Sequence, residues 1–256
     1  MDNINAFWEM HQGGKVLFLG NAWDGASARM LAAAGFQAIG TTSWGIADSF
    51  GLPDGEKMAF NMNLKIIREI VESVEIPVSA DIESGYAEDN ETIVRHVLQV
   101  AKTGAAGINI EDSMKNGDGL RDLAEHAEYL SAIRSALDAA GYERFFINAR
   151  SDIYLQETPS QEEAVKRAKA YEQAGASGIF LPGLTEENAV RELVDALEVP
   201  LNLLSLPGLT NVEKLKSWGV RRFSIGNALS DKIFAIMREE AKQMVNSGGT
   251  SRLYAR

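Results

Sequence analysis

The chain of 256 residues contains no cysteine and only three histidines. Without cysteine it can form no disulfide, no cysteine nucleophile, no thiolate zinc site and no iron–sulfur cluster. Basic residues are also outnumbered, because 25 Lys and Arg against 36 Asp and Glu give a net charge of −11. That balance opposes binding to nucleic acid or to an anionic membrane.

Long apolar segments are absent as well. No run approaches the roughly 20 apolar residues that a membrane span needs. The first five residues lack the apolar stretch of a signal peptide. We therefore expect a soluble, cytoplasmic protein with no nucleic-acid or membrane partner. The composition, 45% hydrophobic and 24% charged, is that of a folded chain with a substantial core.

Short β-type runs alternate eight times with amphipathic helical patterns. Each run is mostly apolar, as expected for strands that are covered on both faces. The predicted strands are residues 15–19, 37–42, 77–82, 106–111, 145–150, 178–181, 200–205 and 222–226. Several helical patterns stop at a glycine just before the next strand, which is typical of a left-handed residue after a helix. These glycines are Gly35, Gly104, Gly175 and Gly219.

Eight such units in 256 residues predict a (β/α)₈ TIM barrel. The alternative is a doubly wound open sheet, which usually has a glycine-rich phosphate-binding turn after its first strand. Residues 20–25 lack the G-x-G-x-x-G pattern, and this favours the barrel. No linker divides the chain, so we expect one domain over residues 1–256, with 228–256 as a C-terminal helix and tail.

The active site of such a barrel lies at the carboxyl ends of the strands. Strand periodicity places Asp81 and Glu83 on one face, and Glu111 ends the next predicted strand. Three converging carboxylates repel one another unless a cation lies among them. Oxygen ligands without cysteine favour Mg²⁺, with Mn²⁺ possible, over zinc. One carboxylate would bind the metal directly and the others through water.

Arg150 ends the fifth predicted strand and can hold a substrate carboxylate with two hydrogen bonds. A metal beside this arginine suits a small 2-oxo or 2-hydroxy acid and can stabilise the enolate formed by C–C or C–P cleavage. Asn202, in the seventh predicted strand, is a further candidate for substrate binding.

Structural interpretations compete with these functional ones. An acid at a strand end can cap a helix or pair with arginine, and Glu83 can simply bond to the following loop. Residues 41–43 can be turn residues, and Trp44 can be a packing residue. We expect His11 and His126 on the surface and His96 within a helix, and we assign catalysis to none of them.

The sequence resembles the isocitrate lyase/phosphoenolpyruvate mutase superfamily at these residues. Each similar segment is short, but the segments occur in the family's order over about residues 16–230. They are N-A-W-D-G-A-S-A-R at 21–29, A-G-F-Q-A-I at 34–39, G-L-P-D at 51–54, A-D-I-E-S-G-Y at 80–86, G-I-N-I-E-D at 107–112 and I-N-A-R-S-D at 147–152.

The resemblance implies a (β/α)₈ barrel whose last helix packs on a partner subunit, giving a homodimer or homotetramer. It also implies an Mg²⁺ enzyme that makes or breaks C–C or C–P bonds in 2-oxo and 2-hydroxy acids. Asp81 would bind the metal directly, and Glu83 and Glu111 would act through water. The resemblance further implies that Arg150 clamps the substrate. By the same resemblance, Thr42, Ser43 and Trp44 would bind substrate, largely through their backbone N–H groups. Asp54 would be an acid near the mouth of the barrel.

Two departures bear on the chemistry. The lyases carry a Lys-Lys-Cys-Gly-His loop after the fourth strand, whereas this chain has S-M-K-N-G-D-G at residues 113–119. Pro182-Gly183 replaces the glutamate that those lyases have after the sixth strand. The mutase branch has a longer loop bearing lysine and asparagine, and Lys115 and Asn116 can play analogous catalytic parts. This loop is expected to be a mobile lid or, equally, a plain surface loop.

The resulting hypothesis is an Mg²⁺-dependent lyase or decarboxylase that cleaves a C–C bond in a small 2-oxo or 2-hydroxy carboxylate. One alternative is a C–P mutase or hydrolase acting on phosphonopyruvate-like compounds. Another is a barrel that binds oxo acids without turning them over. A purely structural protein fits poorly with converging buried charge.

Overall fold

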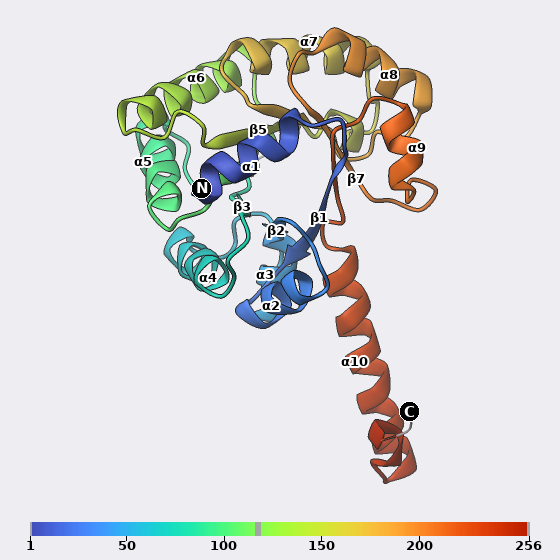
Figure 1. Ribbon diagram of the computed structural model, residues 1–256. Coiled ribbons are helices and arrows are strands. Elements are labelled where there is room, and N and C mark those ends of the chain that lie inside the picture. The colour runs from blue at the N-terminus through green and yellow to red at the C-terminus, as the bar shows by residue number, and fades with distance from the viewer. Residues whose placement is uncertain (1, 116–118, 255–256) are drawn as a thin grey trace.

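The computed structural model describes residues 2–115 and 119–254, and its centre is a closed barrel of eight strands (Figure 1). Each strand pairs in parallel with the next, and β8 closes the barrel against β1. The (β/α)₈ prediction is therefore confirmed. The strands are β1 (Leu17–Ala22), β2 (Ile39–Thr41), β3 (Val78–Asp81), β4 (Gly107–Glu111), β5 (Phe146–Arg150), β6 (Gly178–Phe180), β7 (Leu201–Leu204) and β8 (Arg222–Ser224).

Helices surround the barrel. The four glycines predicted to end helices all have positive φ, between 89° and 99°, which confirms that prediction. No helix in the described part of the chain is long and apolar enough to cross a membrane. The helices are α1 (Asn3–Gln12), α2 (Gly25–Ala33), α3 (Ser43–Ser49), α4 (Phe60–Glu72), α5 (Asn90–Ala101), α6 (Leu123–Ala139), α7 (Gln161–Gln173), α8 (Glu187–Ala196), α9 (Val212–Ser217) and α10 (Ala228–Ser247), with short 3₁₀ turns η1 (Ile153–Leu155) and η2 (Ser251–Tyr254).

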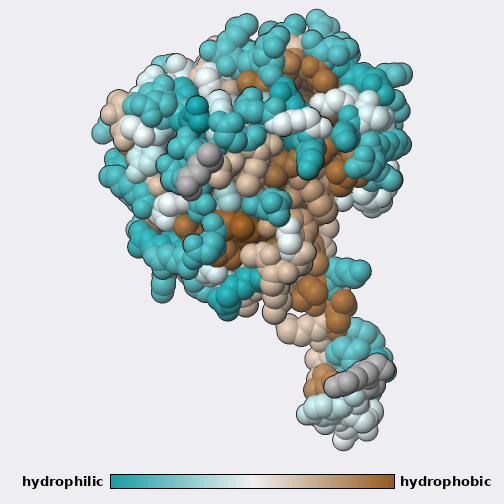
Figure 2. All heavy atoms as spheres, viewed as in Figure 1, coloured by the Kyte–Doolittle hydropathy of each residue, from teal (hydrophilic) through white to brown (hydrophobic). Residues whose placement is uncertain are grey.

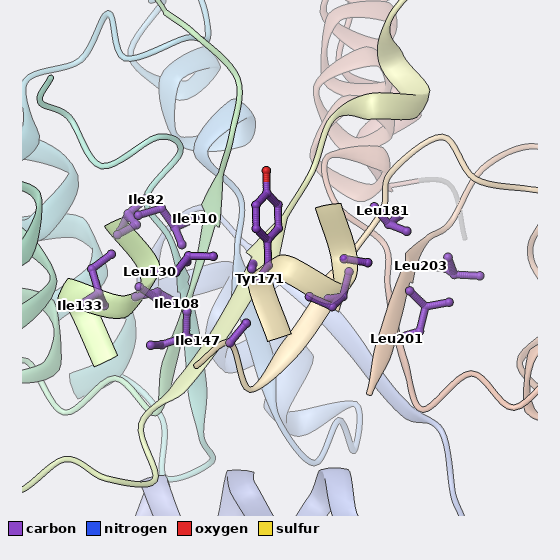
Figure 3. Packing of buried hydrophobic residues seen from close by; sticks show 14 of the residues in the cluster. Ile82, Ile108, Ile110, Leu130, Ile133, Ile147, Tyr171, Leu181, Leu201 and Leu203 are labelled. Carbon is purple, nitrogen blue, oxygen red and sulfur yellow. The ribbon is translucent and has the colours of Figure 1, made fainter. Parts of the chain in front are cut away.

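The main hydrophobic core lies between the barrel and its helices. Ile108 of β4 and Ile147 of β5 are paired on neighbouring strands. Together with Leu130 of α6 they belong to one buried cluster between the barrel and its helices (Figure 3). All three side chains are fully buried. Burying one such side chain contributes about 1.5–3 kcal/mol to the stability of the folded state. This layer therefore holds the strands, and with them the strand ends, in place.

The barrel interior is polar, whereas bulky branched residues fill most barrels of this kind. Arg222 is only 1% exposed, and its Nη2 donates to Ser79 Oγ and to Asn109 Oδ1, both at 3.2 Å. Asn148 Nδ2 donates to the same Asn109 oxygen at 2.7 Å. Burial lowers the pKa of Arg222 to about 9. These side chains from four strands form a bonded layer beneath the carboxyl ends of the strands.

Helix α1 crosses one end of the barrel (Figure 1), and this corrects the prediction for His11. The imidazole is completely buried and stacks on Phe146, with ring centroids 3.9 Å apart. The prediction for His126 was also wrong, because it is 1% exposed and its ring lies 4.8 Å from that of Tyr171. Burial lowers the pKa of both histidines to about 3. His96 lies within α5, as predicted.

Helix α10 projects away from the barrel and carries the C-terminal end of the chain (Figure 1). It matches the predicted final helix. Hydrophobic residues are visible on the surface of this helix (Figure 2). Ile233, Ile236, Met237 and Val245 are 43%, 49%, 66% and 82% exposed. The helix thus carries apolar side chains that its own barrel does not cover.

Candidate active site

A cavity of about 300 Å³ opens at the carboxyl ends of the strands. Its polar lining includes Ser43, which follows β2, Asp81 and Arg150, which end β3 and β5, and Asn109, which lies within β4. The parallel register explains this convergence, because Asp81 pairs with Asn109 and Glu111 pairs with Arg150 across neighbouring strands. The barrel therefore gathers at one end most of the polar groups that the sequence places at strand ends.

Asp81 is held in one orientation by its neighbours. Its backbone N–H donates to Thr41 Oγ1 at 2.8 Å, and its Oδ2 accepts from the Ser43 hydroxyl at 2.8 Å and from the Ser43 backbone N–H at 3.2 Å. The other carboxylate oxygen, Oδ1, is buried and has no hydrogen-bond partner among the described residues. A buried carboxylate oxygen without a partner is costly. Asp81 Oδ1 thus fits an oxygen that binds a cation.

Glu83 and Glu111 both face the ammonium group of Lys115. Lys115 Nζ lies 2.5 Å from Glu111 Oε1 and 3.2 Å from Glu83 Oε2. Burial lowers the pKa of Lys115, but the two carboxylates outweigh it and hold that pKa above its usual range. Burial also raises the pKa of Glu83 to about 7, against the opposing charge of Lys115. Lys115 therefore supplies a cation where the sequence predicted that converging acids need one.

The Glu83 backbone adopts the left-handed conformation, with φ 48°, and its side chain bonds to nearby loop residues. Glu83 Oε2 accepts from the Glu56 backbone N–H at 2.8 Å, and Oε1 accepts from the Tyr86 hydroxyl at 2.9 Å. Glu56 in turn accepts from the backbone N–H of Tyr86 at 2.8 Å. Glu83 therefore makes the hydrogen bonds to loop residues that its structural interpretation predicts.

Arg150 is fixed by two carboxylates. Its Nε and Nη2 donate to the two oxygens of Asp152 at 2.6 and 3.0 Å, and its Nη1 lies 2.9 Å from Glu111 Oε2. Burial lowers its pKa, but Glu111 and Asp152 together raise it above the ordinary arginine value. These bonds use three of the five N–H groups that a guanidinium carries. Arg150 remains partly exposed to the cavity, with N–H groups left for an anionic ligand.

Thr42, Ser43 and Trp44 lie at the start of α3 and line the same cavity. The Thr42 N–H donates to Ala22 O at 3.0 Å and the Ser43 N–H to Asp81, so two of the three backbone donors are engaged. The Trp44 indole is 48% exposed and donates to Asp231 of α10 at 3.0 Å. Asp54 lies at the exposed rim of the cavity.

The loop after β4 folds back on itself. Ser113 and Leu120 form an antiparallel bridge, and the Met114 N–H donates to Gly119 O at 3.1 Å. Asn116, the second predicted catalytic residue of this loop, lies outside the described residues. Asn202 lies deeper, in register with Arg222, and is completely buried. It does not belong to the lining of the cavity.

A three-acid metal site is not formed in advance by the described residues, because no three His, Asp or Glu side chains among them are placed to hold an ion on their own. Glu83 and Glu111 instead contact Lys115. Of the three predicted metal-binding acids, only Asp81 has a buried carboxylate oxygen without a hydrogen-bond partner among the described residues, and its role as the single direct ligand stays a prediction. Magnesium usually keeps several waters, so one protein carboxylate is a sufficient anchor.

Sequence reasoning missed one side of the cavity. Leu155, Phe180 and Leu204 form an apolar wall together with Pro182. Phe180 pairs with Arg150 in the strand register, so the period-two argument that placed Arg150 could have placed Phe180 as well. Leu155 lies in the 3₁₀ turn η1 after β5, and no sequence pattern marked it.

Comparison with known proteins relates the whole barrel to one group of enzymes. A family model described as phosphoenolpyruvate phosphomutase matches residues 7–245. The 2-methylisocitrate lyase of Salmonella typhimurium is 30% identical over 226 residues, covering 82% of this chain and 76% of that protein. The oxaloacetate decarboxylase of Pseudomonas entomophila is 29% identical over 230 residues, covering 87% and 78%. The crystal structure of 2,3-dimethylmalate lyase matches with a TM-score of 0.89 and 26% identity, covering 97% of this chain and 89% of that one.

Proposed function

The chain belongs to the phosphoenolpyruvate phosphomutase family, and we propose that it is a divalent-metal-dependent enzyme that cleaves a C–C bond in a small 2-oxo or 2-hydroxy carboxylate. The relatives support this class, since they are named as a 2-methylisocitrate lyase and an oxaloacetate decarboxylase. The observation that carries the proposal is the buried Oδ1 of Asp81, which has no hydrogen-bond partner within the described part of the chain and lies in the cavity that Arg150 also lines.

Asp81 would hold Mg²⁺, or Mn²⁺, through Oδ1, while its Oδ2 stays bonded to Ser43. Glu83 and Glu111 would contribute negative charge around the ion through water. When bound, the metal supplies positive charge that stabilises the negative charge developing on a substrate oxygen. A water-poor cavity strengthens that stabilisation, because electrostatic interactions are weakly screened there.

Arg150 would bind the substrate carboxylate. Its guanidinium is held in place by Asp152 and Glu111, so little orientational freedom is lost when the substrate arrives. The backbone N–H of Trp44, which has no hydrogen bond to another described residue, and the side-chain amide of Asn109, whose oxygen is already bonded to Asn148, are further donors along the cavity. These groups orient an oxo acid beside the proposed metal position.

Lys115 is the proposed proton donor. Its raised pKa keeps Nζ protonated at neutral pH. Lys115 is not itself part of the cavity lining, but it contacts Glu111, which lies 2.9 Å from the guanidinium of the cavity residue Arg150. Cleavage of a bond next to a 2-oxo group leaves a carbanion-like carbon that must receive a proton. A side chain from the loop at residues 113–120 would deliver it, and Asn116 of the same loop is proposed to assist.

The test of this proposal is calorimetric binding of oxalate, a small analogue of a 2-oxo acid enolate. Wild-type protein should bind oxalate with Mg²⁺ present and lose that binding in excess chelator. Asp81→Asn keeps the shape of the side chain but removes the charge, and it should abolish metal-dependent binding. Asp138→Asn, on the exposed face of α6, is the matched control and should bind as the wild type does. Full oxalate binding in chelator would contradict the metal assignment.

A further inference from the structure

The cavity has two chemically different sides. The polar side, with Ser43, Asp81, Asn109 and Arg150, is described above. The opposite side is the apolar wall of Leu155, Phe180, Pro182 and Leu204, contributed by η1, β6 and β7. A cavity of about 300 Å³ is at the small end of ligand sites, so one small molecule must touch both sides at once.

Two glycines hold the leucines of the wall in place. A Cβ at Gly226 would come within 2.7 Å of Leu204 Cδ1, so Leu204 occupies space that exists because residue 226 has no side chain. A Cβ at Gly183 would lie 3.0 Å from Leu155 Cδ2 in the same way. Both glycines also have positive φ, 55° and 89°, which side chains rarely adopt. The wall is therefore a built feature of the cavity and not a chance gap.

The wall borders the carboxylate clamp directly. The Arg150 guanidinium carbon lies 5.7 Å from the centre of the Phe180 ring, and the two residues are paired in the strand register. Phe180 is only 5% exposed. A carboxylate bound to Arg150 would thus have hydrocarbon beside it on the β6 and β7 side.

Charge separates the candidate ligands. Among the described residues that line the cavity, Arg150 alone carries a positive side chain, whereas Asp54 and Asp81 are negative. A ligand with one carboxylate can pair with Arg150 and the proposed metal. A second carboxylate pointing at Leu155, Phe180 and Leu204 would lose its hydration and find no cation, which is strongly unfavourable.

We infer that the substrate is a monocarboxylic 2-oxo or 2-hydroxy acid whose far end is a short hydrocarbon group, and that Phe180 and Leu204 determine this specificity. The inference rests on the proposed function, since it takes the polar side as the oxo-acid site. It differs from that proposal by assigning the remainder of the ligand. Each methylene placed against the wall should raise affinity about three- to fourfold.

The test compares ligands of matched length by calorimetry in the presence of Mg²⁺. The probes are oxalate, pyruvate, 2-oxobutanoate, 2-oxopentanoate and 2-oxoglutarate. Affinity should rise along the pyruvate, 2-oxobutanoate and 2-oxopentanoate series, and 2-oxoglutarate should bind at least about tenfold more weakly than 2-oxopentanoate. Leu204→Arg adds a cation to the wall and should reverse that order. Met30→Arg, at a 72% exposed position on α2, adds the same charge away from the cavity and should leave the order unchanged.

The outcomes distinguish the two claims. If oxalate binds with Mg²⁺ but 2-oxoglutarate binds as well as 2-oxopentanoate, the specificity inference is wrong and the proposed function stands. If oxalate does not bind at all, both are wrong. The comparison of ligands on the wild-type protein decides the matter even if Leu204→Arg fails to fold.

Discussion

Replacing His126 with phenylalanine should make the protein more resistant to acid. The imidazole is 1% exposed, and neither of its nitrogens has a hydrogen-bond partner among the described residues. Burial first, and then the charges of Arg121 and Arg167, lower its pKa from 6.5 to about 3. The native state therefore keeps His126 neutral over a pH range in which the unfolded chain binds a proton.

The sign and size of the effect follow from proton linkage. Between about pH 6.5 and pH 3 the unfolded state binds one more proton at this site, so the free energy of unfolding falls as the pH falls through that window. The slope is about 1.4 kcal/mol per pH unit. From pH 7.5 to pH 4.5 the wild type should lose about 2.7 kcal/mol through His126 alone. His126→Phe removes this loss and leaves the contributions of the carboxylates in place.

Urea denaturation at several pH values between 7.5 and 4.5 measures the difference between the two proteins. At pH 7.5 the phenylalanine variant should be at least as stable as the wild type, because it removes a buried N–H that no described residue accepts from. Its advantage should then grow by about 1.4 kcal/mol for each pH unit below 6.5. A constant difference across the range would refute the reasoning. His11→Phe should show the same pH dependence, since burial and the charge of Arg222 also lower the pKa of His11 to about 3, but this variant loses the hydrogen bond between His11 Nδ1 and Phe7 O and should be less stable at pH 7.5.

Three further outcomes are expected. Lys115→Met should lower turnover by about 100-fold or more while changing the dissociation constant of oxalate by less than about threefold, because the ammonium group is proposed to donate a proton and not to bind the ligand; wild-type turnover would exclude that role. Arg150→Lys should weaken oxalate binding by about tenfold, measured by calorimetry, because one ammonium cannot replace the planar guanidinium; unchanged affinity would refute the clamp. We also propose that the exposed apolar side chains of α10 mediate a dimer or tetramer. Sedimentation velocity should then find no monomer at micromolar concentration, and Ile236→Glu should shift the protein toward smaller species. A monomeric wild type would contradict this proposal.

The barrel could be predicted from the sequence because its signals are local. Each strand is a short apolar run, and each glycine such as Gly104 or Gly175 ends a helix through its own backbone conformation. The burial of His11 was not predictable in this way. It depends on α1 lying across the barrel end and on a ring stack with Phe146, which is far away in the sequence.

The candidate site was predictable in part for the same reason. The positions of Asp81, Glu111 and Arg150 follow from strand ends and from a period of two. The hydrogen-bond and ion-pair partners of these side chains do not follow from their positions at the strand ends. Lys115 turns back to Glu111 and Glu83 because the loop folds on itself, and the left-handed backbone at Glu83 directs that side chain to neighbouring loop residues. The apolar wall combines separate elements, so only the folded chain reveals it.

The central claim is metal-dependent C–C cleavage of a small oxo or hydroxy acid. It is tested most directly by incubating the protein with oxaloacetate, alkylmalates, 2-methylisocitrate and phosphonopyruvate, with Mg²⁺ or with excess chelator, and identifying the products. The account predicts C–C cleavage of at least one carboxylate in the presence of Mg²⁺ and none in chelator or with Asp81→Asn. Turnover of phosphonopyruvate alone would assign C–P chemistry instead. Metal-dependent oxalate binding without turnover of any candidate, or turnover that persists in chelator, would contradict the claim.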